Sequence, residues 1–139
     1  MKTTVIAVLT VLALVCLALA QQPTAKTVPA SASADSGKET YGASCASCHG
    51  ADARGNGPVT PALKRVPPDL TKLARSNGGK FPSTKVYRLI QGDPDLPAHG
   101  SKSMPVWGPI FLEKDKLDHA RMQQRIQGLV DYIATLQAK

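Results

Sequence analysis

Two cysteines and a histidine in the first half of this 139-residue chain have the spacing of a cofactor attachment site. In the segment Cys45-Ala46-Ser47-Cys48-His49 the thiols stand three positions apart and an imidazole follows the second. This is the pattern for c-type haem. Each thiol can add to one vinyl group of the porphyrin, and the histidine is then held where its imidazole reaches the iron. We therefore predict one haem c, attached covalently through Cys45 and Cys48, with His49 as an axial ligand.

A pair of cysteines at this spacing also occurs in three different kinds of site. A thioredoxin-like redox pair would need a βαβ pattern, which is not visible around residues 41–50. A structural zinc site usually needs four ligands, often as two separated pairs. The chain has no second cysteine pair, and His99 and His119 stand alone. A plain disulfide remains open in an exported protein, although it would not account for His49.

Met104 is the predicted second axial ligand. It lies 55 residues (104 − 49) beyond His49, far enough for the chain to wrap a haem and return on its other face. Pro105 biases Met104 away from helix, so we predict an extended loop over residues 103–108. A histidine and a thioether together raise the iron potential and suit electron transfer. In the same loop, Trp107 could cover a haem edge or donate its indole N–H to a propionate.

Three other residues compete with Met104 for the iron. Met122 falls on the apolar stripe of the last predicted helix, where core packing accounts for it better. His99 and His119 would give bis-histidine ligation, but histidines in polar, charged or glycine-rich surroundings are usually solvated. We therefore keep Met104 as the predicted ligand.

The first 20 residues have the pattern of a secretory signal peptide. Lys2 supplies the positive start, residues 5–20 are almost wholly apolar, and the segment ends with the small residues Ala18 and Ala20. We expect cleavage after Ala20 and a periplasmic or otherwise exported protein, which suits haem c because bacteria attach it outside the cytoplasm. An uncleaved membrane anchor is the alternative, but the apolar stretch is short for a span of about 20 residues.

We predict three parts of the chain: a signal peptide over residues 1–20, a flexible tail over 21–35 and one folded domain over 36–139. The tail is rich in Pro, Ala, Ser and Thr, and such a composition cannot bury enough surface to offset the cost of ordering. The domain has few aromatic side chains, which make up 4% of the chain. A covalent haem would supply the missing apolar core of so small a domain.

The mature chain would be basic. Removal of Lys2 with the leader leaves 16 basic and 10 acidic side chains, a net charge of +6. No helix–turn–helix or aromatic platform is present, so we expect no nucleic acid partner. The charge suits docking to redox partner proteins with an acidic surface, because complementary fields speed encounter. Scattered solvated lysines would account for it equally well. We expect a monomer that meets the membrane only through a partner complex or an uncleaved leader.

Hydrophobic periodicity predicts an all-α fold. Ser36 and Glu39 resemble a capping box, so a helix is expected to begin at Ser36 and to end near residues 45–50. This arrangement puts Cys45 and Cys48 on nearly one face of the helix, where both sulfurs can meet the same porphyrin edge.

The rest of the domain alternates loops with three helices. Residues 51–82 predict loops, with a short helix around 70–75 capped by Asp69. A second helix is expected from Ser83 to a stop at Gly92. The last covers residues 118–137, with an apolar stripe over about five turns. A haem would organise the long loops that wrap around it.

With these features the chain resembles the bacterial class I cytochromes c, small helical proteins with one haem. The resemblance covers most of residues 36–139 and rests on the opening helix, the motif at 45–50, the Met104-Pro105 loop and the closing helix. It implies that the first and last helices cross near-perpendicularly. Their contact would involve Gly37 and Tyr41 on the first helix and Tyr132 on the last.

The resemblance also implies a role for the loop Gly55-Asn56-Gly57-Pro58, which would pass behind the proximal ligand. The Pro58 carbonyl would accept a hydrogen bond from the Nδ1–H of His49. Such a contact orients the imidazole and increases its basicity, leaving Nε2 for the iron.

The function that these features predict is reversible one-electron transfer between redox partners, without catalytic residues and hence not as an enzyme. A haem-bearing subunit or tethered module of a larger oxidase or dehydrogenase complex is the first alternative. A haem peroxidase would need an open iron site and usually a second haem, whereas the chain has one CXXCH motif. A gas sensor would need a ligand that carbon monoxide readily displaces.

Overall fold

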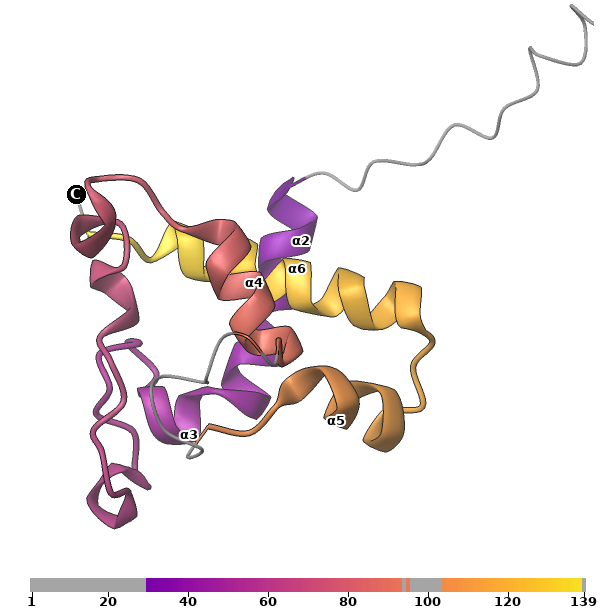
Figure 1. Ribbon diagram of the computed structural model, residues 1–139, viewed down its shortest axis with the longest axis horizontal. Helices are drawn as coiled ribbons and strands as arrows, with labels where there is room; N and C mark the ends of the chain where they lie inside the picture. Colours follow the sequence, from indigo (N-terminus) through magenta and orange to yellow (C-terminus); the bar gives the residue numbers. More distant parts are fainter. Residues whose placement is uncertain (1–29, 94, 96–103, 139) are drawn as a thin grey trace, which may run out of the picture.

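The computed structural model describes residues 30–93, 95 and 104–138 of the chain. The predicted signal peptide, residues 21–29 of the predicted tail and His99 lie outside the described residues. Within them the elements are α2 (Ala30–Ser44), α3 (Ala46–His49), the 3-10 helices η1 (Thr60–Ala62), η2 (Leu70–Lys72) and η3 (Arg75–Asn77), and the helices α4 (Ser83–Gln91), α5 (Trp107–Lys114) and α6 (His119–Thr135) (Figure 1). These residues contain no strand, so the all-α prediction is confirmed. None of the described helices is both long and apolar enough to cross a membrane.

The predicted start of the first helix is wrong. Helix α2 begins at Ala30, so Ser36 lies inside it, and the Ser36 carbonyl accepts a hydrogen bond from the Thr40 hydroxyl at 3.0 Å. Residues 30–35 are alanine and serine apart from Asp35, and alanine is the strongest helix former, so the helix extends upstream of the capping-box pattern. Residues 30–35, which were predicted as part of the flexible tail, are therefore helical.

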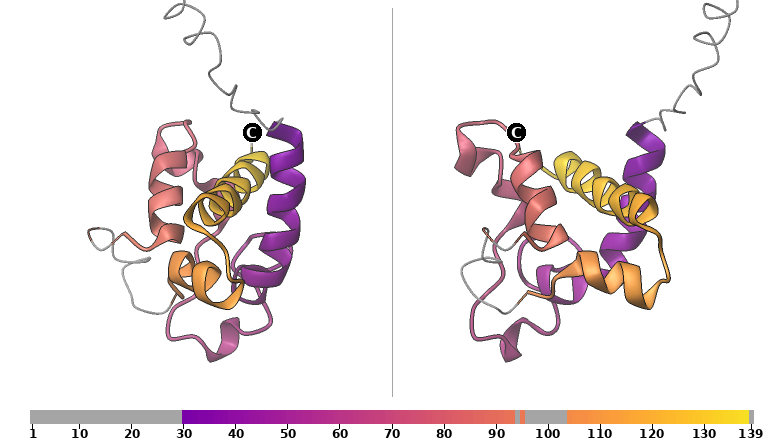
Figure 2. Two further views of the ribbon diagram at one scale, coloured as in Figure 1. Left: turned by 90° about the vertical axis from the view of Figure 1, so that its right-hand side faces the viewer. Right: turned by 45° about the vertical axis from the view of Figure 1, so that its right-hand side comes forward.

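Helices α2 and α6 cross at the centre of the fold, as two further views show (Figure 2). At the crossing, a Cβ on Gly37 would lie less than 3.0 Å from the carbonyl oxygen of Gly128, so the two backbones are in direct contact. One turn further along α2, Tyr41 packs on Tyr132 with ring centroids 5.4 Å apart. The contact predicted for Gly37, Tyr41 and Tyr132 is present, and the sequence analysis missed Gly128.

Helix α6 supplies most of the core beneath this crossing. Its apolar stripe is buried as predicted, with Ile126 and Leu129 fully enclosed. Asp118 caps the helix, because its carboxylate accepts from the Arg121 N–H at 2.8 Å. The amphipathic helix α6 thus packs against α2, whose end is followed by Cys45 and then by α3, which carries Cys48.

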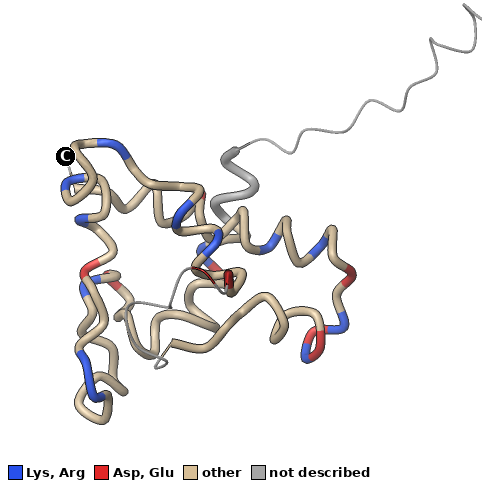
Figure 3. Tube along the Cα trace, viewed as in Figure 1, with Lys and Arg blue, Asp and Glu red and all other residues tan. Residues whose placement is uncertain are grey.

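Helix α4 runs from Ser83 and stops at Gly92 as predicted, with Gly92 in the left-handed conformation at φ 96°. The long 50–82 segment that precedes α4 is mostly loop and contains several of the basic residues (Figure 3). Within it Asp69 caps η2, since its carboxylate accepts from the Thr71 N–H at 2.9 Å. The short helix predicted after Asp69 is therefore confirmed as a 3-10 turn.

The extended loop predicted over residues 103–108 is wrong in its second half, where α5 begins at Trp107. Pro109 falls in the first turn of α5, where its missing N–H is tolerated. Trp107 and Phe111, one turn apart, stack with ring centroids 5.5 Å apart, and Phe111 is buried in the core. Tertiary burial therefore stabilises a helix whose Gly and Pro locally favour a loop.

Candidate cofactor site

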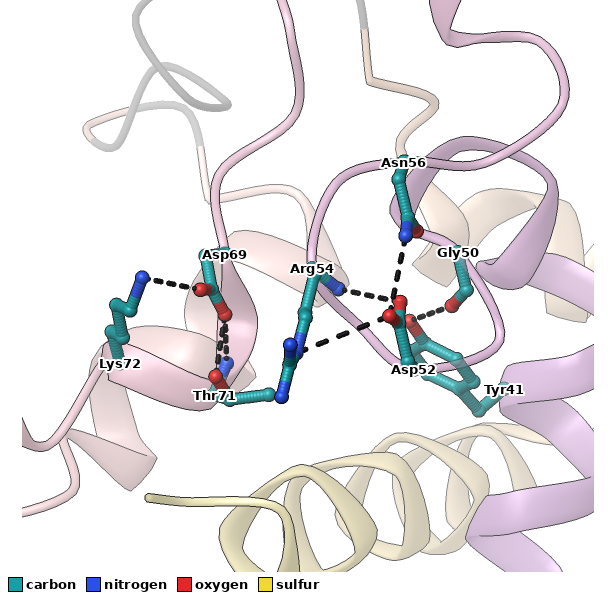
Figure 4. A network of polar contacts seen from close by, with 8 residues as sticks. All are labelled: Tyr41, Gly50, Asp52, Arg54, Asn56, Asp69, Thr71 and Lys72. Atoms are coloured by element: carbon teal, nitrogen blue, oxygen red, sulfur yellow. Dashed lines mark hydrogen bonds and ion pairs between the residues drawn. The ribbon is translucent and has the colours of Figure 1, made fainter. Parts of the chain in front are cut away.

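The two cysteines and the histidine lie at the junction of α2 and α3. Cys45 separates the two helices, and its carbonyl accepts hydrogen bonds from the N–H of Cys48 at 3.1 Å and of His49 at 2.9 Å. The Tyr41 hydroxyl donates to the Gly50 carbonyl at 2.8 Å and so pins the end of the motif (Figure 4). Burial raises the pKa of Tyr41 above its usual range, so this hydroxyl keeps its donor proton.

The Cys45 and Cys48 thiols are free, with Cys45 buried and Cys48 half-buried. Burial, followed by the neighbouring Cys48, raises the pKa of the Cys45 thiol to about 12. A disulfide oxidoreductase needs a lowered thiol pKa and an accessible thiolate. The environment of Cys45 therefore does not fit the thioredoxin-like alternative.

A cavity in two adjoining halves opens beside this motif. The first half has a volume of about 560 Å³ and the second about 500 Å³, each within the roughly 300–1,000 Å³ of small-molecule sites. The halves share four lining residues, which are Cys45, Pro68, His49 and Met104. Both predicted iron ligands and one predicted attachment thiol thus line a single cavity that is divided into two halves.

The cavity wall suits a large apolar group. The first half is also lined by Ala43, Ser44, Ser47, Cys48, Leu63, Arg65, Val66, Pro67, Pro105 and Trp107. The second is also lined by Leu70, Leu73, Ser76, Asn77, Pro82, Lys85, Val86, Leu89, Ile90 and Ile133. Val66 is 73% exposed in this wall, and an apolar porphyrin face would cover it. The residues present therefore fit a covalently attached haem.

The position of Met104 is set by the junction between α4 and α5. A Cβ on Gly92 would lie less than 3.0 Å from the Val106 side chain, and one on Gly108 would lie less than 3.0 Å from the Gln91 carbonyl oxygen. The end of α4 and the start of α5 are thus in direct contact. This contact holds the segment that carries Met104 beside the cavity that Met104 lines.

The loop predicted to pass behind the proximal histidine packs against the motif backbone. Gly55 N–H donates to the His49 carbonyl at 2.7 Å, and Gly57 N–H donates to the Cys48 carbonyl at 3.1 Å. A Cβ on Gly57 would lie less than 3.0 Å from the Ser47 carbonyl oxygen, so only glycine fits this approach. The predicted hydrogen bond from His49 Nδ1 to the Pro58 carbonyl is not formed in the described structure, and Pro58 itself does not line the cavity.

A polar cluster centred on Asp69 stabilises the part of the cavity wall that contains Leu70. Asp69 accepts from the Thr71 hydroxyl at 2.6 Å and pairs with Lys72 at 2.9 Å (Figure 4). These contacts lower the pKa of Asp69 to about 2, with the Thr71 hydroxyl as the largest cause. The carboxylate therefore stays ionised and keeps η2, which carries the lining residue Leu70, in its capped form.

Hydrogen bonds of Gln137 connect the part of the cavity wall that contains Leu70 with the end of α6. Its Nε2 donates to the Leu70 carbonyl at 2.7 Å and to the Ile133 carbonyl at 2.9 Å, while its Oε1 accepts from the Ala74 N–H at 2.8 Å. The sequence analysis missed Gln137, and no local pattern marks it, because its partners in the wall lie more than sixty residues away. It thereby connects the closing helix to the cavity.

Most of the predicted site residues meet at the cavity. Cys45, Cys48, His49, Met104 and Trp107 all line it. The competing residues lie elsewhere: Met122 is buried in the core on α6, and His119 is exposed at the first position of that helix. The sequence analysis also missed Arg65 and Lys85 as lining residues.

An all-α fold that closes around a CXXCH motif, with a methionine at the same cavity, defines a c-type cytochrome with one haem. The family model described as cytochrome C oxidase, cbb3-type, subunit III matches residues 32–133, and the chain belongs to this family. It is a haem-bearing electron-transfer module with covalently bound haem c. No curated protein and no solved structure matches the chain.

Proposed function

We propose that this cytochrome carries single electrons between redox proteins through a haem iron ligated by His49 and Met104. The observation that carries the proposal is that both residues line both halves of the cavity, next to Cys45. When bound, the haem supplies an iron that alternates between the ferrous and ferric states. Histidine and methionine ligation favours a raised potential, which suits a carrier.

The residues of the chain hold and tune the cofactor in this mechanism. Cys45 and Cys48 fix the porphyrin edge through thioethers. The buried His49 imidazole and the Met104 thioether would bind the haem iron from the cavity wall. The apolar lining excludes water and disfavours the extra charge of the oxidised iron, which supports a high potential. No bond of a substrate is made or broken, so no catalytic acid or base is required, and we propose no enzymatic activity.

A second candidate is a fixed role in a larger oxidase complex. The observation that favours it is the family match, whose description names a subunit of cbb3-type cytochrome c oxidase. The two candidates share the same haem chemistry and differ in whether the cytochrome diffuses. Native purification separates them: a free carrier elutes alone, and a subunit elutes with its larger partners.

We also propose export, with removal of residues 1–20, since the leader pattern ends at Ala20. The sequence of the mature N-terminus, determined on protein from the periplasmic fraction, tests this. A terminus at Gln21 agrees with the proposal, and an intact leader in a membrane fraction contradicts it.

The absorption spectrum of the haem-loaded protein tests the ligand assignment. The ferric form is expected to show the weak long-wavelength band that arises from a sulfur–iron bond, and the ferrous form a low-spin c-type spectrum. A high-spin ferric spectrum without that band would favour a peroxidase. Ready displacement of Met104 by carbon monoxide in the ferrous protein would favour a gas sensor.

A further inference from the structure

The segment that carries Met104 leaves the helical part of the fold and returns to it at one place, the end of α4. Asp93 is the first residue after Gly92, and its backbone N–H donates to the Arg88 carbonyl at 3.0 Å. On the return, Val106 lies against Gly92, because a Cβ on Gly92 would meet the Val106 side chain at less than 3.0 Å. The chain is therefore held on both sides of Met104 by the last turn of one helix (Figure 1).

An ion pair across the end of α4 fixes the point where this segment begins. The Arg88 guanidinium donates from Nε to one oxygen of the Asp93 carboxylate, and the other oxygen accepts from the Asp95 N–H at 2.9 Å. The hydrogen bond from Arg88 lowers the pKa of Asp93 below its usual range, so the carboxylate stays ionised at neutral pH. One carboxylate thus connects a side chain of α4 with the backbone two residues further along the Met104 segment.

The Arg88–Asp93 pair is better shielded from water than a typical surface pair. The Asp93 side chain is 17% exposed and the Arg88 side chain 45%. By contrast, the pair of Arg121 with Asp118 on α6 is 74% and 66% exposed, with its atoms 3.8 Å apart. Opposite charges attract more strongly where less water surrounds them. The pair at the end of α4 is therefore suited to hold the chain in one conformation.

We propose that the Arg88–Asp93 ion pair positions Met104, and that it sets how firmly the thioether resists displacement by an external nitrogen base. This proposal rests on the proposed ligation of the iron by Met104. Arg88 and Asp93 line neither half of the cavity, whereas Met104 lines both, so the pair acts through the ligand segment. Fixing the start of the segment removes conformations in which Met104 lies elsewhere. The effective concentration of the thioether at the iron is raised accordingly.

Imidazole titration of the haem-loaded ferric protein at neutral pH measures the displacement of Met104. The test variants are Arg88→Gln and Asp93→Asn. The second keeps an amide oxygen that can accept from the Asp95 N–H and removes only the charge. We expect each variant to bind imidazole about fivefold more tightly than the wild type, the upper range for a partly exposed ion pair. The reason is that Met104 is detached for a larger fraction of the time. The double variant should gain no more than either single variant, because both changes break the same contact.

Two controls match these variants in charge. Asp95→Asn removes a carboxylate at an exposed position two residues beyond Asp93. Arg121→Gln removes a guanidinium from the more exposed ion pair on α6. Both controls should bind imidazole within about 1.5-fold of the wild type. A rise in Asp95→Asn equal to that in Asp93→Asn would show that only the local charge matters, and it would overturn the proposal.

Two further measurements separate positioning from a general loosening of the fold and from a failed carrier. Gly37→Ala disturbs the distant contact between α2 and α6. If it raises imidazole affinity as much as Asp93→Asn does, affinity follows overall stability and the ion pair has no specific role. The sulfur–iron band of the wild type reports the ligation by Met104. If that band is absent, the proposed carrier fails; if it is present while Asp93→Asn binds imidazole like the wild type, only the positioning role fails.

Discussion

Gly37 on α2 lies so close to Gly128 on α6 that a Cβ on the first would approach the carbonyl oxygen of the second to less than 3.0 Å. The missing side chains let the two backbones touch, and the Tyr41 and Tyr132 rings pack beside the contact. Cys45 follows two helical turns after Gly37, so the crossing sets how the attachment motif meets the core behind it.

Gly37→Ala is expected to destabilise the haem-loaded protein by about 1–3 kcal/mol, because the added methyl group forces the two helices apart. Urea unfolding followed by far-UV circular dichroism measures the change. Gly42→Ala is the matched control, since nothing lies within 4 Å of a Cβ at this exposed position of the same helix. Alanine is the better helix former, so the control should be neutral or slightly stabilising. Equal unfolding midpoints for the two variants would contradict the close contact.

The sequence predicts those parts of the fold that local signals specify. Asp69 caps a turn and Gly92 ends a helix, as predicted, because capping and left-handed stops depend only on neighbouring residues. The CXXCH motif likewise fixes its own backbone turn. The motif and Met104 can be proposed as one site from the sequence for a different reason: haem ligation chemistry, not local backbone structure, links the two.

The parts that the sequence does not reveal depend on distant contacts. Helix α5 begins with Trp107, Gly108 and Pro109, which locally favour a loop, and becomes a helix because Gly108 abuts the Gln91 carbonyl and Phe111 is buried. The link from Gln137 to the cavity wall involves hydrogen bonds across more than sixty residues. Neither can be inferred from a short window of sequence.

Replacing Met104 by alanine is expected to remove the sulfur–iron band and to lower the reduction potential on the order of 0.1 V, within the roughly 0.8 V that axial ligands span. Loss of the thioether favours the ferric state, because a soft sulfur ligand stabilises ferrous iron. Redox titration followed in the Soret region measures the shift. Met122→Leu serves as the control: it changes a buried core methionine outside the cavity and should preserve the band and the potential. An unchanged potential in Met104→Ala would contradict the assignment.

Gly108→Ala tests how Met104 is positioned. A Cβ there would collide with the Gln91 carbonyl oxygen and push α5 away from α4. We expect a loss of about 1–3 kcal/mol in unfolding free energy. The sulfur–iron band should also disappear on heating before the helical signal does, because the Met104 segment is released first. Simultaneous loss of both signals, at the wild-type temperature, would show that this contact does not hold the ligand.

Gln137→Ala should destabilise the protein by about 1–3 kcal/mol, because the Ala74 N–H and the Leu70 carbonyl lose their partner in a partly buried place. Hydrogen exchange of the 70–77 amides should accelerate more than exchange in α2, since the wall is loosened locally. Gln127→Ala is the control: it removes an exposed glutamine of α6 that donates to Asp131 on the same helix, and it should change stability by less than about 0.5 kcal/mol. Uniform exchange in Gln137→Ala would refute a local role.

The Asp69 carboxylate should make the free energy of unfolding depend on pH in the acid range. Its folded-state pKa of about 2 lies below the value of about 3.9 in an unfolded chain, so the unfolded state binds the proton more readily. The stabilisation is therefore complete above about pH 4 and is lost as the pH falls towards 2. Asp69→Asn should show a flatter decline of stability than the wild type across this window, measured by urea unfolding at each pH.

Thr71→Val tests whether the Thr71 hydroxyl lowers the pKa of Asp69. The Thr71 hydroxyl is the largest contributor to the lowered pKa of Asp69, so its removal should raise that pKa towards the ordinary value while the backbone cap from the Thr71 N–H remains. NMR titration of the Asp69 carboxyl carbon measures this directly. The acid loss of stability should then shrink, because folded and unfolded pKa values come closer together. An Asp69 carboxyl that titrates in Thr71→Val as it does in the wild type would assign the shift to Lys72 instead.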